Sequence, residues 1–564
     1  MQLEVLEPQV KKSKFKSDPL FSIIVPIYDI KPKVLKRCLM SLQDQDYLNK
    51  EIICVLDGRN AELRRVCHQY DFKIIQIEHS GACAARNAGF KESNGEVVSF
   101  FNSDYVAKPG MLRMWVDALL DHPDCGFVYG GYEYASSRRW FYPSKQFDPY
   151  QLDVANYIDC GFPLWRKHVV DWDVNCKSLQ DWDFWIRVVK KGVKGYYLGR
   201  DYSFIAEPPR PKGLSDDSSS NWIERVTYVK KKNGIPLRDI LVTSLGAANH
   251  AIEIAKLLDA DFREDTIYKP WDYKALYMIG FYIDPGEKGL NEHSRILAYF
   301  KDNYPKTKRI VHFVGADIYK LRKFPYESLK YLSGAIRMTC DRILCENKGA
   351  QEELLEYGIP AQIVPIPSYT PDWEVKPLPD EFSVGIYLVE PGNGIGQSDF
   401  DKYCYEACLS IIRGMPDVKF TGYGYGGKDV RYPNFTYMGL IPRDKWPDYV
   451  YSQSALLRLC RHDHNPMASN EFIMAGRDVV SNIPTLGAHY IDTSGKHELN
   501  EWDKFSEGFN SSNWPETKAK VIRAIRGCKN DLILPSVRKS YSDELKKTLD
   551  QNVYINKIKE LCGL

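Results

Sequence analysis

The chain has 564 residues. That is too many for one hydrophobic core, so roughly two to four domains are expected. Its 76 Lys and Arg residues almost balance its 74 Asp and Glu residues, which gives a formal net charge of +2. Such a balance produces no strong electrostatic field around the whole protein. It therefore argues against a partner recognised through net charge, such as nucleic acid or an anionic membrane.

The fourteen cysteines form neither a CxxC pair nor a ladder with histidines. They indicate buried thiols in a reducing compartment rather than a disulfide framework or a zinc site. Residues 1–20 are charged and lack the apolar core of a signal peptide, and no apolar run has the length needed to span a bilayer. We therefore expect a cytoplasmic protein, with a peripheral contact at the inner membrane face left open.

The first 130 residues alternate short apolar runs with amphipathic stretches. These patterns predict buried strands and intervening helices, with strands at 21–29, 51–58, 72–78 and 97–101 and helices at 33–45 and 60–70. The alternation is typical of a doubly wound, Rossmann-like α/β sheet. Residues 130–200 are aromatic and irregular except for a predicted helix at 181–191, and the Pro- and Ser-rich stretch 207–220 predicts a linker or mobile loop.

Two further series of strands and helices follow, at 239–367 and 382–483, separated by a Pro-punctuated joint at 368–380. The polar, helical tail at 535–562 has the length to pack back across another domain. The pattern predicts an α/β protein built from the following parts: a leader (1–20), a first domain (21–220) and two Rossmann-like halves (221–375 and 376–564).

The predicted strand at 97–101 ends directly in Asn102-Ser103-Asp104. In open α/β sheets ligands bind beyond the carboxyl ends of the strands. An acid at such an end can reach a hard divalent cation, which in turn can hold a diphosphate. Taken alone, this stretch fits an Asx-type turn better than a ligand site.

Other motifs accompany it in a fixed order: SIIVPIYD (22–29), EIICVLDG (51–58), GACAARNAGF (81–90) and SLQDWDFWIRV (178–188). Together with 102–104 this order resembles the inverting family-two glycosyltransferases of GT-A fold, across nearly all of residues 21–200. The resemblance implies that the strand end at Pro26 cradles a nucleotide. It also implies that Asp57 contacts the uracil or ribose of a UDP-sugar, and that Arg86 meets a phosphate with paired donors.

The same resemblance implies that Asn102 and Asp104 contact the donor and that Asp104 binds Mn²⁺ or Mg²⁺ on its diphosphate. Asn102 stands where the family has its first acid, so metal dependence weaker than usual is expected. Asp181 corresponds to the general base that deprotonates the acceptor hydroxyl, with Trp182 and Trp185 lining the acceptor. Each residue also has a structural alternative, such as a turn for Asp57, a surface ion pair for Arg86 or a helix cap for Asp181.

The stretch RLCRHDHNPMASNEFIMAGRDVVSN (458–482) resembles the retaining family-four glycosyltransferases, which have two Rossmann-like halves in a GT-B fold. The resemblance implies that Glu471 holds the nucleotide ribose and that Asp463 lies at the sugar as the catalytic acid. No metal is expected there, because backbone N–H groups at a helix start can receive a diphosphate. Arg458 replaces the family's basic residues by position, and His312 is assigned to the acceptor side, although a buried core histidine is the commoner case.

The function predicted from both resemblances is a glycosyltransferase of the hexosyl- or N-acetylhexosaminyltransferase type, with two transfer sites. It would move sugars from nucleotide-sugar donors, with UDP-sugars favoured, to a glycan or lipid-linked saccharide. Three alternatives stay open. Only one module is catalytic and the other docks a ligand; the acceptor is a modified nucleobase in DNA; or the protein binds carbohydrate without catalysis.

Overall fold

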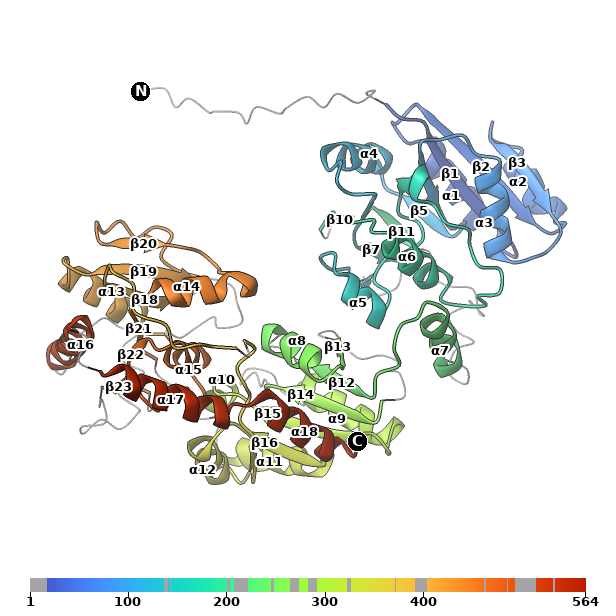
Figure 1. Ribbon diagram of the computed structural model, residues 1–564. Coiled ribbons are helices and arrows are strands. Elements are labelled where there is room, and N and C mark those ends of the chain that lie inside the picture. The colour runs from blue at the N-terminus through green and yellow to red at the C-terminus, as the bar shows by residue number, and fades with distance from the viewer. Residues whose placement is uncertain are drawn as a thin grey trace, which may run out of the picture. The chain divides into compact units, whose positions relative to one another are not determined.

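The computed structural model describes the following residues: 18–135, 140–142, 144–199, 203–206, 222–244, 248–263, 273–281, 292–321, 326–370, 372–390, 403–460, 463–483, 485–491, 514–530 and 533–564. The chain forms two compact units, Met1–Leu237 (unit 1) and Arg238–Leu564 (unit 2), which Figure 1 shows as ribbons. The predicted loop at 207–220 and residues 1–17 of the predicted leader lie outside the described residues.

Unit 1 is built on a seven-stranded sheet of order β10-β6-β9-β4-β1-β2-β3. Its strands are β1 (Phe21–Ile27), β2 (Lys50–Asp57), β3 (Lys73–Ile77), β4 (Val97–Phe100), β6 (Phe127–Tyr129), β9 (Leu164–Trp165) and β10 (Gly195–Tyr197). Strand β1 is parallel to both β2 and β4, as the β–α alternation predicts, and β9 enters antiparallel to β4. A smaller sheet of order β5-β11-β7-β8 contains β5 (Tyr105–Ala107), β11 (Phe204–Ala206), β7 (Tyr132–Tyr134) and β8 (Trp140–Tyr142).

The helices of unit 1 are α1 (Pro32–Gln43), α2 (Ala61–Cys67), α3 (Ala82–Lys91), α4 (Met111–Asp121), α5 (Pro149–Val154), α6 (Gln180–Lys190) and α7 (Trp222–Lys232). Helix α1 starts at Pro32, whose fixed φ suits the first helical position. Helix α3 packs closely on β1 at Gly89. A Cβ atom at this position would lie 2.4 Å from Ile24 Cγ2, so only glycine leaves enough room. A larger residue at position 89 would push α3, and the loop that precedes it, away from the sheet.

Helix α7 belongs to unit 1, whereas the sequence prediction began the second domain at residue 221. Lys232 on α7 forms ion pairs with Asp173 at 2.6 Å and with Asp183 at 2.9 Å. Since Asp183 is fully buried on α6, this pairing ties α7 to the first domain. The boundary between the compact units therefore lies after α7, at Leu237.

Unit 2 contains two six-stranded sheets. The first has the order β13-β12-β14-β15-β16-β17, and its pairs are parallel. Its strands are β12 (Ile240–Thr243), β13 (Asp261–Arg263), β14 (Ala275–Ile279), β15 (Lys308–Phe313), β16 (Arg342–Cys345) and β17 (Gln362–Ile363). The helices of this half are α8 (Ala248–Leu257), α9 (Glu292–Asn303), α10 (Ala316–Leu321), α11 (Tyr326–Thr339) and α12 (Lys348–Glu356).

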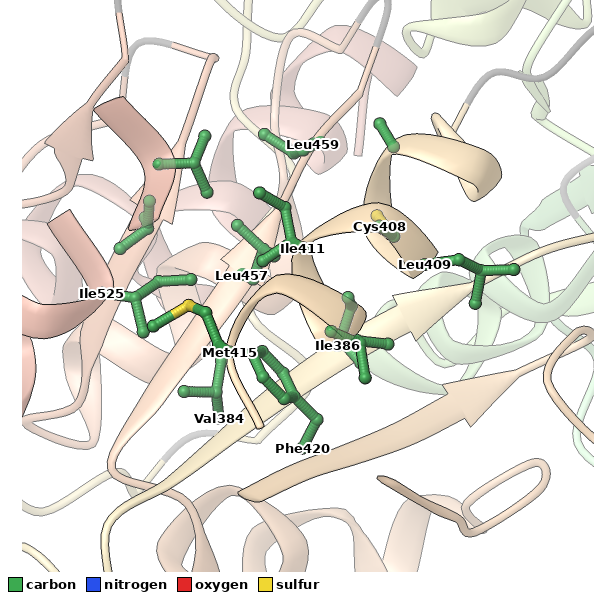
Figure 2. Close-up of a cluster of buried hydrophobic side chains, with 14 of the residues drawn as sticks. Val384, Ile386, Cys408, Leu409, Ile411, Met415, Phe420, Leu457, Leu459 and Ile525 are labelled. Atoms are coloured by element: carbon green, nitrogen blue, oxygen red, sulfur yellow. The ribbon is translucent and has the colours of Figure 1, made fainter. Parts of the chain in front are cut away.

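The second sheet has the Rossmann order, β20-β19-β18-β21-β22-β23, and is also parallel. Its strands are β18 (Ser383–Leu388), β19 (Lys419–Gly424), β20 (Phe435–Tyr437), β21 (Ala455–Arg458), β22 (Asp478–Ser481) and β23 (His489–Tyr490), and its helices are α13 (Tyr405–Gly414), α14 (Trp446–Ser452), α15 (Met467–Met474) and α16 (Trp514–Lys529). Figure 2 shows the core of this half, in which Ile411 from α13 and Met415, directly after that helix, pack against residues of the strands.

Two C-terminal helices, α17 (Pro535–Thr548) and α18 (Gln551–Cys562), connect the halves of unit 2. Ser542 on α17 donates a hydrogen bond to the Met474 carbonyl of α15 at 2.7 Å. On α18, the hydroxyl of Tyr554 lies 2.8 Å from that of Tyr277 on β14. The tail thus packs back on the first half of unit 2, as the predicted length and helicity of residues 535–562 allow.

The mixed α/β class with parallel sheets, predicted from the sequence, is confirmed. All fourteen cysteines are free, and most of them are buried, in agreement with the absence of a disulfide pattern. None of the described helices is both long enough and apolar enough to cross a membrane.

Candidate functional site

Polar residues gather where β2, β3 and β4 of unit 1 end. Asp57, the last residue of β2, is buried, and its Oδ1 accepts a hydrogen bond from the Ser80 N–H at 2.7 Å. Its Oδ2 accepts one from the Gly81 N–H at 3.0 Å and lies 3.0 Å from Nδ1 of His79. Asp57 therefore shapes the loop that leads into α3, while its direct contact with a nucleotide stays a prediction.

The ring of His79 stacks on that of Tyr28, with centroids 4.1 Å apart and planes 12° from parallel. Tyr28 is about half exposed and follows the end of β1, one residue after Ile27. Pro26, assigned to the nucleotide, lies within β1 opposite Val55 of β2. The stacked pair presents a flat aromatic surface beside Asp57, of the kind on which a planar ring can lie.

Arg86 is the hub of the site. It is buried on α3, and its Nη2 donates to Oδ1 of Asn102 at 3.0 Å while its Nη1 donates to Oε1 of Gln180 at 3.0 Å. Its guanidinium carbon lies 4.4 Å from the ring centroid of Trp172. Arg86 thus links the end of β4 to the start of α6, and the surface ion pair considered as its alternative is wrong, because the side chain is buried.

Asp104 supplies the carboxylate of the stretch after β4. Asn102 carries a neutral amide whose oxygen already accepts from Arg86, and Ser103 is buried. Mg²⁺ is commonly held by one or two carboxylates together with substrate phosphates and waters. On these terms Asp104 would be a single protein ligand that holds a divalent cation together with a diphosphate, and this role stays a prediction.

Asp181 lies in the first turn of α6. Its Oδ2 accepts a hydrogen bond from Nδ2 of Asn156 at 2.8 Å, and its Oδ1 accepts one from the Trp182 N–H at 3.0 Å. Burial raises the pKa of Asp181 above its ordinary value, while the Trp182 N–H, Arg86 and Asn156 oppose that rise. A carboxylate with a raised pKa is a stronger proton acceptor, as a general base requires.

A second carboxyl, that of Asp159, shares this region and was not predicted. It is 8% exposed, and its Oδ2 accepts a hydrogen bond from the Tyr105 hydroxyl at 2.7 Å. Its Oδ1 accepts the Gly161 N–H at 2.7 Å. Burial, together with the negative charge of Asp181, raises the pKa of Asp159 to about 7.

The two tryptophans assigned to the acceptor are core residues, so that prediction is wrong. Trp182 is 3% exposed and donates its indole N–H to the Leu152 carbonyl. Trp185 is completely buried and packs on Phe127 with ring centroids 4.6 Å apart. Trp182 thus contacts α5 and Trp185 contacts β6, so neither buried ring can line an acceptor.

Unit 2 contains a cavity of about 740 Å³ between its two halves. It is lined by residues of both halves, including His250 and Glu346 from the first and Arg458, Asp463 and Glu471 from the second. The predicted residues of 458–471 therefore do converge on one space. The glycine-rich stretch 391–396 and Gly246 lie outside the described residues.

Glu471, on α15, is 1% exposed and its carboxylate is closely surrounded by donors. It forms an ion pair with Arg443 from the 3-10 turn Arg443–Lys445. It also accepts hydrogen bonds from the Trp446 indole at 2.6 Å and the Ser368 hydroxyl at 2.8 Å. This carboxylate is thus neutralised by an arginine that the sequence prediction did not include.

Arg458 and Asp463 form a second ion pair at the cavity, with Nη2 and Oδ2 2.8 Å apart. The Arg458 guanidinium also lies over the rings of Tyr387 and Tyr403, 5.4 and 5.0 Å from their centroids. With Tyr369, Tyr423 and Tyr425, these rings make the cavity wall largely aromatic with polar edges. Such a wall suits sugar or base rings, which need both stacking and hydrogen bonds.

His312 does not line this cavity. It is fully buried on β15, and its Nδ1 lies 2.6 Å from the Tyr277 hydroxyl, which in turn contacts Tyr554. Burial lowers the pKa of His312 to about 3, so the ring is neutral. His312 is therefore better described as a buried core histidine, the alternative given above, than as a residue that contacts an acceptor.

Residues 22–172 match the family described as Glycosyl transferase family 2. The chain is 30% identical over 191 residues to an uncharacterized glycosyltransferase of Rickettsia conorii, which covers 30% of this chain and 31% of that protein. It is 34% identical over 136 residues to the uncharacterized glycosyltransferase EpsJ of Bacillus subtilis. That alignment covers 22% of this chain and 38% of EpsJ. The chain thus spans about a third of the length of these curated relatives.

Among solved structures, residues 1–349 of TarS from S. aureus, in complex with UDP-GlcNAc, align with a TM-score of 0.33 and 19% identity. The alignment covers 38% of this chain and 66% of that one. The region of unit 1 that matches the family includes Asp57, Arg86 and Asp104 but ends before Asp181.

Proposed function

We propose that unit 1 transfers a sugar from a nucleotide-sugar donor, with inversion, to a hydroxyl of a glycan or lipid-linked saccharide. The observation that carries this proposal is the position of Arg86. Its two guanidinium nitrogens join Asn102, next to the candidate metal ligand, to Gln180, next to the candidate base. The family match of residues 22–172 supports the reaction class.

In the proposed reaction Asp181 accepts the proton of the acceptor hydroxyl. The hydroxyl oxygen forms a bond to the anomeric carbon while the bond from that carbon to the diphosphate oxygen breaks, and the nucleoside diphosphate leaves with the bonding electrons. A divalent cation held by Asp104 would offset the charge that develops on the leaving diphosphate. The stacked Tyr28 and His79 are placed to receive the base of the nucleotide.

The experiment is a panel of UDP-, GDP- and CMP-sugars tested for hydrolysis or transfer by the purified chain, with and without Mn²⁺. We expect one donor class, with UDP-sugars favoured, to be turned over faster with Mn²⁺, and Asp104→Ala to remove most of that stimulation. Turnover that survives Asp104→Ala and Asp181→Asn unchanged would exclude the proposed site. Nucleotide-sugar binding without hydrolysis or transfer would favour the carbohydrate-binding alternative.

We also propose that unit 2 is a second transferase of GT-B type that needs no metal. Two parallel six-stranded sheets, linked by C-terminal helices and enclosing an aromatic cavity with Glu471 at its wall, support this proposal. Glu471→Ala should abolish one transfer and leave the other intact. Because this change leaves Arg443 unpaired, Glu471→Gln and a thermal melt should accompany it.

Loss of both transfers in a folded Glu471→Ala protein, or of neither, would count against independent sites. In that case the favoured function of unit 2 is a docking module. A modified nucleobase in DNA is the alternative acceptor, because a net charge of +2 leaves room for a local basic groove. Retention of DNA at low salt that is lost as salt rises would favour that acceptor.

A further inference from the structure

The segment Asp159–Gly161 connects the two sides of the unit 1 site. Asp159 accepts from the hydroxyl of Tyr105, the residue directly after Asp104. The backbone carbonyl of Asp159 accepts the indole N–H of Trp185, on the helix that begins beside Asp181, at 3.1 Å. The segment thus contacts Tyr105, which follows the candidate metal ligand Asp104, and helix α6, which carries the candidate base Asp181.

The next residues of the segment reinforce this bridge. Cys160 Sγ lies 3.6 Å from Oδ1 of Asn102 and 3.7 Å from Nη2 of Arg86. The Gly161 carbonyl accepts the Ser99 hydroxyl of β4 at 2.6 Å. Asp159 itself contacts β5 and α6, and its carboxyl cannot turn away without breaking the hydrogen bonds from the Tyr105 hydroxyl and the Gly161 N–H.

Asp159 and Asp181 also interact electrostatically. Burial and the negative charge of Asp181 raise the pKa of Asp159, while the hydrogen bonds from the Gly161 N–H and the Tyr105 hydroxyl and the positive charge of Arg86 lower it. Two buried carboxyls whose charges interact do not both ionise readily. The titratable and charged groups that face Asp159 are Tyr105 on β5, Arg86 on α3, Asp181 on α6 and the adjacent Cys160.

We propose that Asp159 is a positioning residue of the unit 1 site: it carries the proton of the Asp159–Asp181 pair, which leaves Asp181 ionised, and it joins Tyr105 to the helix of the base. The inference rests on the proposed transfer in unit 1 and adds a residue to it. Among neutral replacements, Asn resembles the protonated Asp159, whereas Ala removes the contacts with Tyr105 and Gly161.

The kinetic test compares the parent, Asp159→Asn and Asp159→Ala. At pH 6 we expect Asp159→Asn to retain kcat within about threefold, and Asp159→Ala to lower kcat at least about tenfold with the donor KM unchanged. As the pH rises through about 7, Asp159 of the parent ionises and increases the proton affinity of Asp181. The parent kcat should therefore rise across this range, and the rise should be absent from Asp159→Asn.

A second readout needs no activity. A carboxyl whose pKa is raised by folding stabilises the protein fully below its unfolded pKa, and that stabilisation is lost as the pH rises through the folded pKa. For Asp159 the decline falls between its ordinary value and about pH 7. We expect the Tm of Asp159→Asn to gain about 4 °C on the parent between pH 5.5 and 7.5.

Ser99→Ala is the matched control, because it removes a buried hydrogen bond to the same segment without changing a charge. It should lower Tm equally at both pH values. If the parent turns over no donor, the proposed function fails. The Tm comparison then still tests whether Asp159 is protonated in the folded protein. Equal pH profiles of kcat, or equal pH dependence of Tm, for the parent and Asp159→Asn would overturn the inference.

Discussion

Each of the two units presents an acid on a short helix, but the partners of the two carboxylates differ. Asp181 on α6 accepts hydrogen bonds from neutral donors, the Asn156 amide and the Trp182 N–H. Glu471 on α15 is paired directly with the Arg443 guanidinium and also accepts from Trp446. The direct hydrogen-bond donors of Asp181 are thus neutral, whereas a guanidinium contacts the carboxylate of Glu471.

The comparison assigns different tasks to the two acids. Asp181, with its pKa raised by burial, suits proton transfer. Glu471, held by charge-assisted hydrogen bonds, suits a fixed acceptor that orients a ligand or a loop at the cavity. The experiments below separate these tasks, beginning with the largest expected effect.

Replacing Asp181 should have the largest effect. Asp181→Asn keeps the shape and one acceptor oxygen but removes the proton acceptor, so kcat should fall about a thousandfold. Calorimetric titration with the donor should give a dissociation constant close to that of the parent, because the donor contacts are retained. A loss of donor binding equal to the loss of turnover would show that Asp181 holds the fold of the site instead.

Replacing Arg443 should affect stability rather than proton transfer. Arg443→Gln leaves the 1% exposed Glu471 without its cation, and we expect a loss of about 2 kcal/mol in the free energy of unfolding of unit 2. Urea unfolding measures this loss. Lys445→Gln, an exposed change two residues away, is the control and should be neutral. Equal stability of the two variants would mean that the pair contributes nothing to the cavity wall.

Replacing Asn102 should have the smallest effect. Asn102→Asp restores an acid beside Asp104, so the Mn²⁺ concentration for half-maximal turnover should fall about fivefold. The gain is limited because the new carboxylate would also pair with Arg86, which lies 3.0 Å from Oδ1 of Asn102. Titrating donor turnover with Mn²⁺ measures this concentration. An unchanged value would show that residue 102 does not contribute to binding the cation.

The sequence located the residues that follow buried strands. Asp57 ends β2 and Asn102 follows β4, because short apolar runs mark strands of a parallel sheet and the polar residue after each run lies at its carboxyl edge. His79 follows β3 in the same way and could have been found by the same rule.

Other residues were beyond sequence reasoning. Asp159 lies in an irregular aromatic stretch, and its importance comes from contacts with Tyr105, 54 positions away, and with α6. Arg443 is 28 positions from Glu471 and belongs to no motif. For Trp182 and Trp185 the sequence does carry a signal, because their i, i+3 spacing within an amphipathic helix indicates a core-facing side.

The central claim is that unit 1 displaces the diphosphate in a single step with Asp181 as base. The most direct measurement is the anomeric configuration of the product, determined by NMR from an α-linked donor with the Glu471→Gln variant, in which unit 2 is impaired. The account predicts a β-linked product that is lost when Asp181→Asn is added. An α-linked product, or a β-linked product formed equally well without Asp181, would contradict it.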